Sequence, residues 1–223
     1  MQLLDLSSTR SKLLAIVANL RGAQEAVLHE PISYLGFPFS LSETFQQRNT
    51  NSSIAESLNT VEELNNLCLK HNKKAVVYLS MGFGNPYGDA WSNEIVEELA
   101  AELVKRGVGI ISLADTIGVS TPEKITTLYA HLLESFPDVE FGVHLHSTPS
   151  SWQEKVEAAY QSGCKRFDSA LGGYGGCPMA ADDLTGNIAT ENVLNYLKSQ
   201  DENLHLDMDA WQEAVRYSKE VFK

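Results

Sequence analysis

Apolar, strand-like segments alternate with helix-like segments along this chain of 223 residues, and that alternation limits the possible folds more than any other feature. Strands are expected at residues 12–19, 32–40, 74–81, 109–116, 140–148 and 165–171. Helices are expected at residues 23–30, 52–71, 92–106, from 121 onward, 152–162, 190–199 and 208–222. Strands that alternate with helices are typical of α/β proteins, in which crossover helices leave the strands parallel.

Both a closed barrel and an open, doubly wound sheet fit this alternation. No expected strand is followed by the G-x-G-x-x-G turn of dinucleotide-binding folds, which weighs against the open sheet. Candidate functional residues follow several strands at their C-terminal ends, as in TIM barrels, which have eight β/α units. We therefore predict an α/β fold, a (β/α)8 TIM barrel truncated to about six β/α units, with residues 1–223 as one domain.

Composition narrows the class of protein. A net charge of −12 argues against nucleic acid and against anionic membranes as partners. The apolar stretch from Leu13 to Ala18 is far too short to cross a bilayer, and the first residues lack the basic region of a signal peptide. The three cysteines show no C-x-x-C spacing, which fits a reducing compartment. We expect a cytoplasmic protein.

A glycine-rich segment, Gly-Gly-Tyr-Gly-Gly-Cys-Pro at residues 172–178, places Cys177 between flexible backbone positions. A thiol in such a loop could serve as a proton donor or a nucleophile, whereas the segment by itself could equally be a plain turn or a phosphate cradle. Cys164 lies between a helix and a strand, and Cys68 lies near the apolar stripe of a helix, so both are expected to be packed.

His144 and His146 are two residues apart on an expected strand and therefore point to the same face. Their apolar neighbours, Val143 and Leu145, suit the face that meets the helices, which leaves both imidazoles inside the barrel near its mouth. One such histidine would more often be a hydrogen-bonded interior residue. Two imidazoles aimed at one point favour a metal site, since neutral imidazole is the commonest metal ligand.

Two further residues are candidates. Asn187 follows a glycine, and its amide oxygen could be a neutral metal ligand, although a Gly-Asn pair is also an ordinary turn. Two nitrogens with hard oxygens suit Mg²⁺ or Mn²⁺, with Zn²⁺ as the alternative. Asp115 ends another strand and is either a carboxylate at the mouth or a residue that caps the loop. Tyr78 and Ser80 share a strand face and are expected to be structural.

The segment at residues 167–178, FDSALGGYGGCP, together with GNIATE at 186–191, resembles the signature of the 3-hydroxy-3-methylglutaryl-CoA lyase family. The His-Leu-His motif at residues 144–146 is similar to the metal-binding motif of that family and of the wider pyruvate carboxyltransferase-like barrels, and LADTIGV at 113–119 and NLRG at 19–22 also match. The resemblance runs from about residue 13 to about residue 197, and its cysteine loop separates the lyases from related synthases.

This resemblance implies a function. The reaction would be the retro-Claisen cleavage of 3-hydroxy-3-methylglutaryl-CoA, an acyl-CoA substrate, to acetyl-CoA and acetoacetate, a step of leucine degradation. His144, His146 and Asn187 would bind Mg²⁺ or Mn²⁺, which would polarise the substrate's hydroxyl and carboxylate oxygens. His144 would also take part in proton transfer, Cys177 would protonate the acetyl-CoA enolate, and Asp115 would assist in acid–base chemistry.

The chain departs from the family pattern in two ways. Ser147 stands where the family carries an aspartate after the second histidine, and the family's first strand, with an Arg-Asp pair, is not found before Leu13. We therefore expect a domain that is incomplete at its N-terminus, binds metal weakly and catalyses little or nothing alone. The alternatives are an acyl-CoA-condensing synthase and an inactive metal-binding remnant, whose open sheet edges would favour a homo-oligomer.

Overall fold

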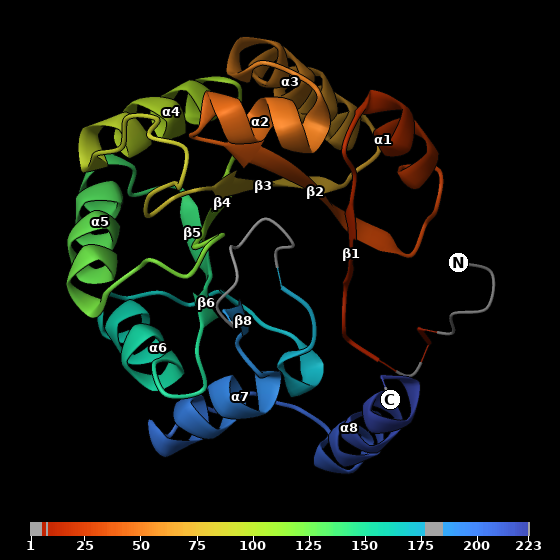
Figure 1. Cartoon of the computed structure of the whole chain (residues 1–223). Helices are drawn as coiled ribbons and strands as arrows, with labels where there is room; N and C mark the ends of the chain where they lie inside the picture. The colour runs from red at the N-terminus through yellow and green to blue at the C-terminus, as the bar shows by residue number, and fades with distance from the viewer. Residues whose placement is uncertain (1–5, 8, 177–184, 223) are drawn as a thin grey trace.

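The computed structural model describes residues 6–7, 9–176 and 185–222 (Figure 1). Six strands form one parallel sheet in the order β1-β2-β3-β4-β5-β7, in which the strands follow their order along the chain and β6 is left out. The strands are β1 (Leu13–Ile16), β2 (Ile32–Ser40), β3 (Lys74–Ser80), β4 (Ile110–Ala114), β5 (Glu140–His144) and β7 (Phe167–Asp168). The predicted parallel sheet of about six β/α units is confirmed.

Helices surround the sheet on its outer side, and the strands curve around a common interior (Figure 1). The helices are α1 (Leu20–Ala26), α2 (Glu43–Thr50), α3 (Ile54–Lys70), α4 (Asn93–Lys105), α5 (Pro122–Ser135), α6 (Trp152–Gln161), α7 (Thr190–Ser199) and α8 (Met208–Val221), with a short 3-10 helix, η1, at Leu171–Gly173. None of the helices in the described part of the chain is long and apolar enough to cross a membrane.

Local sequence explains several helix boundaries. Ser53 caps α3 through a capping box, in which its side chain accepts from the Glu56 amide and the Glu56 carboxylate accepts from the Ser53 amide. α5 begins with Thr121 as its cap and Pro122 in its first turn. Asn19 caps α1, which therefore begins three residues before the expected helix.

The sequence prediction misses three features of the fold. α2 was not expected, because its only apolar residue is Phe45 and the rest of its turns are polar. The expected strand at 140–148 is interrupted after β5, and a separate two-residue strand, β6 (His146–Ser147), pairs antiparallel with β8 (Gly186–Asn187). β7 is also shorter than the seven residues expected for it, since only Phe167 and Asp168 pair with β5.

The apolar core lies between the strands and the outer helices. All five residues of β4 are buried, and Leu113 faces the helices together with Leu79 and Val143 from the neighbouring strands. Gly142 on β5 leaves room for the side chain of Arg166. A Cβ at position 142 would lie only 2.8 Å from Cδ of that arginine. β1 has a single neighbour, β2, in this sheet. Beyond β7, at the opposite edge of the sheet, an isolated parallel bridge joins Ala170 to Ala189.

Candidate active site

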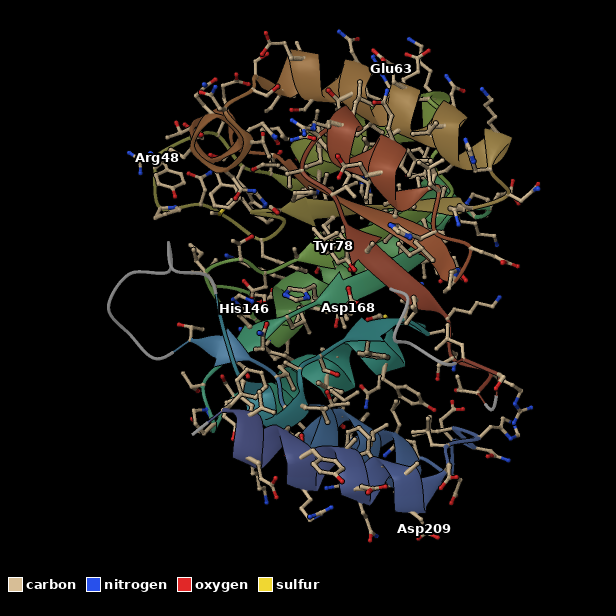
Figure 2. The ribbon with its side chains drawn as sticks, turned by 90° about the vertical axis from the view of Figure 1, so that its right-hand side faces the viewer. Arg48, Glu63, Tyr78, His146, Asp168 and Asp209 are labelled. Carbon is tan, nitrogen blue, oxygen red and sulfur yellow. The ribbon has the colours of Figure 1, made fainter. Side chains whose placement is uncertain are left out.

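A cavity of about 660 Å³ opens at the C-terminal ends of the central strands. Its wall combines apolar and polar side chains. The apolar side chains include Leu14, Ile16, Pro38 and Phe167, and the polar ones include Tyr78, Ser80, His144, His146, Asp168, Asn187 and Thr190. Figure 2 shows Tyr78, His146 and Asp168 gathered in the interior, between the sheet and the C-terminal helices. The strand ends of the sheet thus bring chemistry-bearing side chains to one cavity.

The two histidines of the motif lie together, as the sequence predicts. Nε2 of His144 lies 3.3 Å from Nε2 of His146, with the two rings tilted by 59°. Burial lowers the pKa of both imidazoles, although the nearby carboxylates of Asp168 and Asp115 partly oppose this effect for His144. Both rings are therefore neutral near pH 7, which is the state that binds metal.

Asn187 is the third candidate ligand, and the structure places it beside the pair. It lies opposite His146 in the β6–β8 ladder. Its amide nitrogen donates to the carbonyl of Tyr174 at 2.9 Å, so the amide oxygen is the atom left for another partner. The structure therefore brings together all three of the predicted ligands.

This donor set fits a divalent cation. Two ring nitrogens 3.3 Å apart can both reach one ion, since metal–nitrogen bonds are about 2.0–2.1 Å long. Nδ1 of His146 is buried and has no hydrogen-bond partner within the described part of the chain. Among the described residues, no group of three or more His, Cys, Asp or Glu side chains could hold a metal ion. A third protein ligand beside the two histidines would therefore be the side-chain amide of Asn187.

Asp168 is a site residue that the sequence reasoning missed. Its carboxylate accepts a hydrogen bond from the Ser112 hydroxyl at 3.0 Å and lies 4.0 Å from Nδ1 of His144. Burial is the main reason that the pKa of Tyr78 is raised, and the Asp168 carboxylate adds to it. The position of Asp168 next to His144 follows from the pairing of β5 with β7, which the sequence alone does not give.

Asp115 does not lie on the cavity wall. Its carboxylate accepts from the amide of Ser120 at 3.1 Å, from the Ser120 hydroxyl at 2.5 Å and from Nζ of Lys155 at 2.9 Å. Both Asp115 and Lys155 are fully buried in this ion pair. Of the two roles open to Asp115 from the sequence, the structure matches the one in which it caps a loop. Lys155 was missed because a lysine in an amphipathic helix is normally a solvated residue.

Cys177 lies outside the described residues, but the segment that leads to it begins at the cavity. Gly172 and Gly175 have positive φ values of 64° and 83°, the conformation that the glycine-rich motif predicts. Tyr174 stacks on Phe222 after α8, with 4.8 Å between ring centroids, and Gly176 lines the cavity.

The other two cysteines are packed, as predicted. Cys68 and Cys164 have no exposed surface. Burial raises the pKa of the Cys68 thiol to about 11 and also raises that of Cys164. Neither thiol lines the cavity. They are therefore not candidates for chemistry at this site.

Comparison with known proteins gives concordant matches. A family model described as HMGL-like matches residues 15–217. The hydroxymethylglutaryl-CoA lyase YngG of Bacillus subtilis is 34% identical over 206 residues, which are 92% of this chain and 68% of that protein. The cytoplasmic 3-hydroxy-3-methylglutaryl-CoA lyase of Rattus norvegicus is 33% identical and is covered to 57% of its length, against 89% of this chain.

A solved structure agrees with these sequence matches. The crystal structure of the Bacillus subtilis HMG-CoA lyase superimposes with a TM-score of 0.85 at 34% identity, over 93% of this chain and 69% of the other. The chain thus spans between 57% and 69% of the length of these three proteins. The predicted resemblance to the lyase family and the predicted barrel fold are both confirmed.

Proposed function

Because the chain belongs to the HMGL-like family, we propose that its cavity is the active site of a metal-assisted carbon–carbon lyase. The substrate class is an acyl-CoA thioester with a 3-hydroxyl group, and 3-hydroxy-3-methylglutaryl-CoA is the proposed substrate, cleaved to acetyl-CoA and acetoacetate. The observation that carries the proposal is the convergence of His144, His146 and Asn187 in one cavity at the strand ends.

In this proposal His144, His146 and Asn187 hold a Mg²⁺ or Mn²⁺ ion. A bound cation would supply Lewis-acid polarisation of the substrate's hydroxyl and carboxylate oxygens. Asp168 lies on the Nδ1 side of His144, which favours a proton on that nitrogen and leaves Nε2 free to bind. We assign Asp115 no proton transfer, because its carboxylate is paired with Lys155 away from the cavity.

Cleavage requires one proton to leave the 3-hydroxyl group and another to reach the enolate carbon of acetyl-CoA. We propose that His144 takes part in the first transfer. Cys177 would deliver the second proton, and Gly176, its neighbour in sequence, lines the cavity. Apolar side chains of the wall, among them Leu14 and Phe167, would contact the substrate's methyl group and exclude water from the enolate.

The wall explains why turnover by this chain alone should be low. Neither lysine nor arginine is found among the described residues that line the cavity. The oxygen of the thioester enolate therefore has no cationic donor in that part of the wall. Loss of a single donor to a developing oxyanion typically costs about 10²–10³ in rate. We propose that binding is retained and that cleavage is slow or absent.

Cation-dependent binding tests the proposal first. Calorimetry of 3-hydroxy-3-methylglutaryl-CoA with the chain should show binding with Mn²⁺ and much weaker binding with EDTA. His146→Ala should remove the dependence on Mn²⁺, whereas His131→Ala, which changes a surface histidine paired with Glu97, should keep it. Binding that is unaffected by Mn²⁺ or by His146→Ala would overturn the proposed site.

Product analysis tests the reaction class. Acetoacetate should form slowly or not at all with the chain alone. A condensation product with a 2-oxo acid would favour the related synthase reaction. We also propose a cytoplasmic protein whose residues 1–223 form one domain, in agreement with the cytoplasmic lyase of Rattus norvegicus.

A further inference from the structure

Lys155 is an unusual residue on α6, because its charged end is buried beneath the cavity. Its side chain is 4% exposed, and its ammonium group makes three hydrogen bonds. It donates to the Asp115 carboxylate at 2.9 Å, to the carbonyl of Gly118 at 3.0 Å and to the carbonyl of His146 at 2.8 Å. One side chain thus joins α6, the loop after β4 and one of the proposed metal ligands.

The two histidines are held in different ways. His144 belongs to the main sheet, where it pairs with Ala114 and Asp168, and its carbonyl accepts from the amide of Asp115 at 2.9 Å. His146 lies beyond the end of that sheet, and its strand pairing is with Asn187 in a ladder of two residues per strand. Beyond this short ladder, the Lys155 ammonium gives the His146 carbonyl a second, buried attachment, to α6.

We propose that Lys155 is a positioning residue for the candidate metal centre. It holds the main chain of His146 so that the His146 ring faces His144 and the β6–β8 ladder keeps Asn187 beside them. This inference rests on the proposed function, because it takes these three residues to be the ligands. Asp115 neutralises the ammonium group and allows it to be buried, since a buried charge is tolerated when it is paired and hydrogen-bonded.

A purely structural role for Lys155 makes a different prediction. If the residue only joined α6 to the sheet, its loss would lower stability and leave the affinity of the folded protein for metal unchanged. Residues that orient metal ligands typically change affinity by about 10–100-fold when they are removed. Metal affinity measured on folded protein therefore separates positioning from stability.

The test compares a variant that keeps Lys155 with one that removes both members of the buried ion pair. Asp115→Asn keeps the amine of Lys155 within reach of the His146 carbonyl, whereas Asp115→Asn with Lys155→Met removes both charges together with that hydrogen bond. The difference between the two variants isolates the contribution of Lys155. Circular dichroism and urea unfolding would establish that each variant is folded.

Lys73 provides a matched control. It is also buried, and its ammonium donates to the carbonyls of His29 at 2.9 Å and Ile32 at 2.5 Å. It immediately precedes β3, at the N-terminal ends of the strands, whereas the cavity lies at their C-terminal ends. Lys73→Met should therefore lower stability without changing metal affinity.

Calorimetry with Mn²⁺ and visible absorption of bound Co²⁺ give the readouts. We expect the double variant to bind Mn²⁺ about 10–100-fold more weakly than Asp115→Asn and to show a changed Co²⁺ spectrum. Equal affinity and equal spectra in these two variants would overturn the positioning role while leaving the metal site intact. Absence of Mn²⁺ binding by the unmodified chain would instead contradict the proposed function. If the double variant does not fold, Lys155→Gln in the Asp115→Asn background repeats the comparison with a shorter donor.

Discussion

The fold has two halves that differ sharply, the long strands β2, β3 and β4 and the short strands around the proposed metal ligands. The first half has strands of nine, seven and five residues, paired along their length, and every residue of β4 is buried. In the second half β7 has two residues, and β6 and β8, which form a separate two-stranded sheet, have two residues each. Apolar packing and main-chain hydrogen bonds between long strands stabilise the first half, whereas the two-residue strands of the second half form few such hydrogen bonds.

Individual side chains replace those main-chain hydrogen bonds around the site. Lys155 holds the carbonyl of His146, Ser112 donates to Asp168, and the amide of Asn187 donates to Tyr174. Glu191 at the start of α7 accepts from the amide of Gly172 at 3.0 and 3.2 Å. Stability and site geometry are therefore set by different residues, so that variants should affect one with little effect on the other.

The largest expected effect is on stability in the half with long strands. Leu113→Ala should lower the free energy of unfolding by about 2–5 kcal/mol, because it leaves a cavity in the centre of the core. Urea unfolding followed by circular dichroism measures this loss. Mn²⁺ affinity of the remaining folded protein should be unchanged. A loss of affinity as large as that of a ligand variant would show that the two halves are not separable.

Substitution of a proposed metal ligand should have the opposite effect, a large loss of Mn²⁺ affinity with a small loss of stability. Asn187→Ala removes the proposed oxygen ligand, and we expect Mn²⁺ affinity to fall about tenfold or more. The free energy of unfolding should fall by only about 1 kcal/mol, the typical contribution of the single hydrogen bond to Tyr174. Calorimetry and urea unfolding on the same samples give both quantities. A large loss of stability at unchanged affinity would contradict the assignment of Asn187.

The pH dependence of stability should reflect the buried histidines. In the folded protein burial lowers the pKa of His144 and His146 below the usual 6.5, so the unfolded chain takes up protons first as pH falls. The stability of the metal-free protein should therefore decrease as pH falls through about 6.5 and towards the folded pKa values. Urea unfolding at about pH 7.5 and about pH 5.5 measures the decrease.

A double variant identifies the source of that decrease. His144→Asn with His146→Asn removes both buried imidazoles and leaves the other four histidines in place. We expect a smaller loss of stability over the same pH interval in this variant than in the unmodified chain. An identical loss would assign the pH dependence to other groups.

The smallest expected effect concerns the segment before Cys177. Glu191→Ala removes the acceptor for the amide of Gly172, and we expect faster hydrogen exchange at that amide with a loss of about 1 kcal/mol or less in stability. Glu154→Ala is the control, since Glu154 is likewise an acid in the first turn of a helix, α6. Equal exchange at Gly172 in both variants would show that Glu191 does not hold this segment.

The sequence predicts the sheet better than the surroundings of the site. Alternating segments are enough to predict the parallel strands, and the spacing of His144 and His146 predicts that their rings share a face. α2 escaped prediction because a short polar helix with one buried aromatic residue has no apolar stripe. The position of Asp168 beside His144 depends on strand pairing, and no local pattern specifies a pairing.

Lys155 shows the limit of such reasoning most clearly. Its neighbours Val156 and Ala159 are buried, so the residue lies next to the apolar face of α6, and that position is a weak sign of a buried charge. Its partners Asp115 and Gly118 are distant from it in sequence, His146 lies nine residues before it, and all three meet its ammonium group only in the folded structure. The sequence could therefore suggest the ligands but not the residues that hold them.

Titration of the unmodified chain, His146→Ala and His131→Ala with Mn²⁺ tests the central claim most directly, the claim that His144, His146 and Asn187 form one divalent-cation site. We expect one ion bound per chain in the unmodified protein and in His131→Ala. Affinity should fall about 100-fold or more in His146→Ala, because a direct ligand is lost in addition to any change in orientation. Equal Mn²⁺ binding by the unmodified chain and His146→Ala would contradict the account, since the histidine pair would then not be the site.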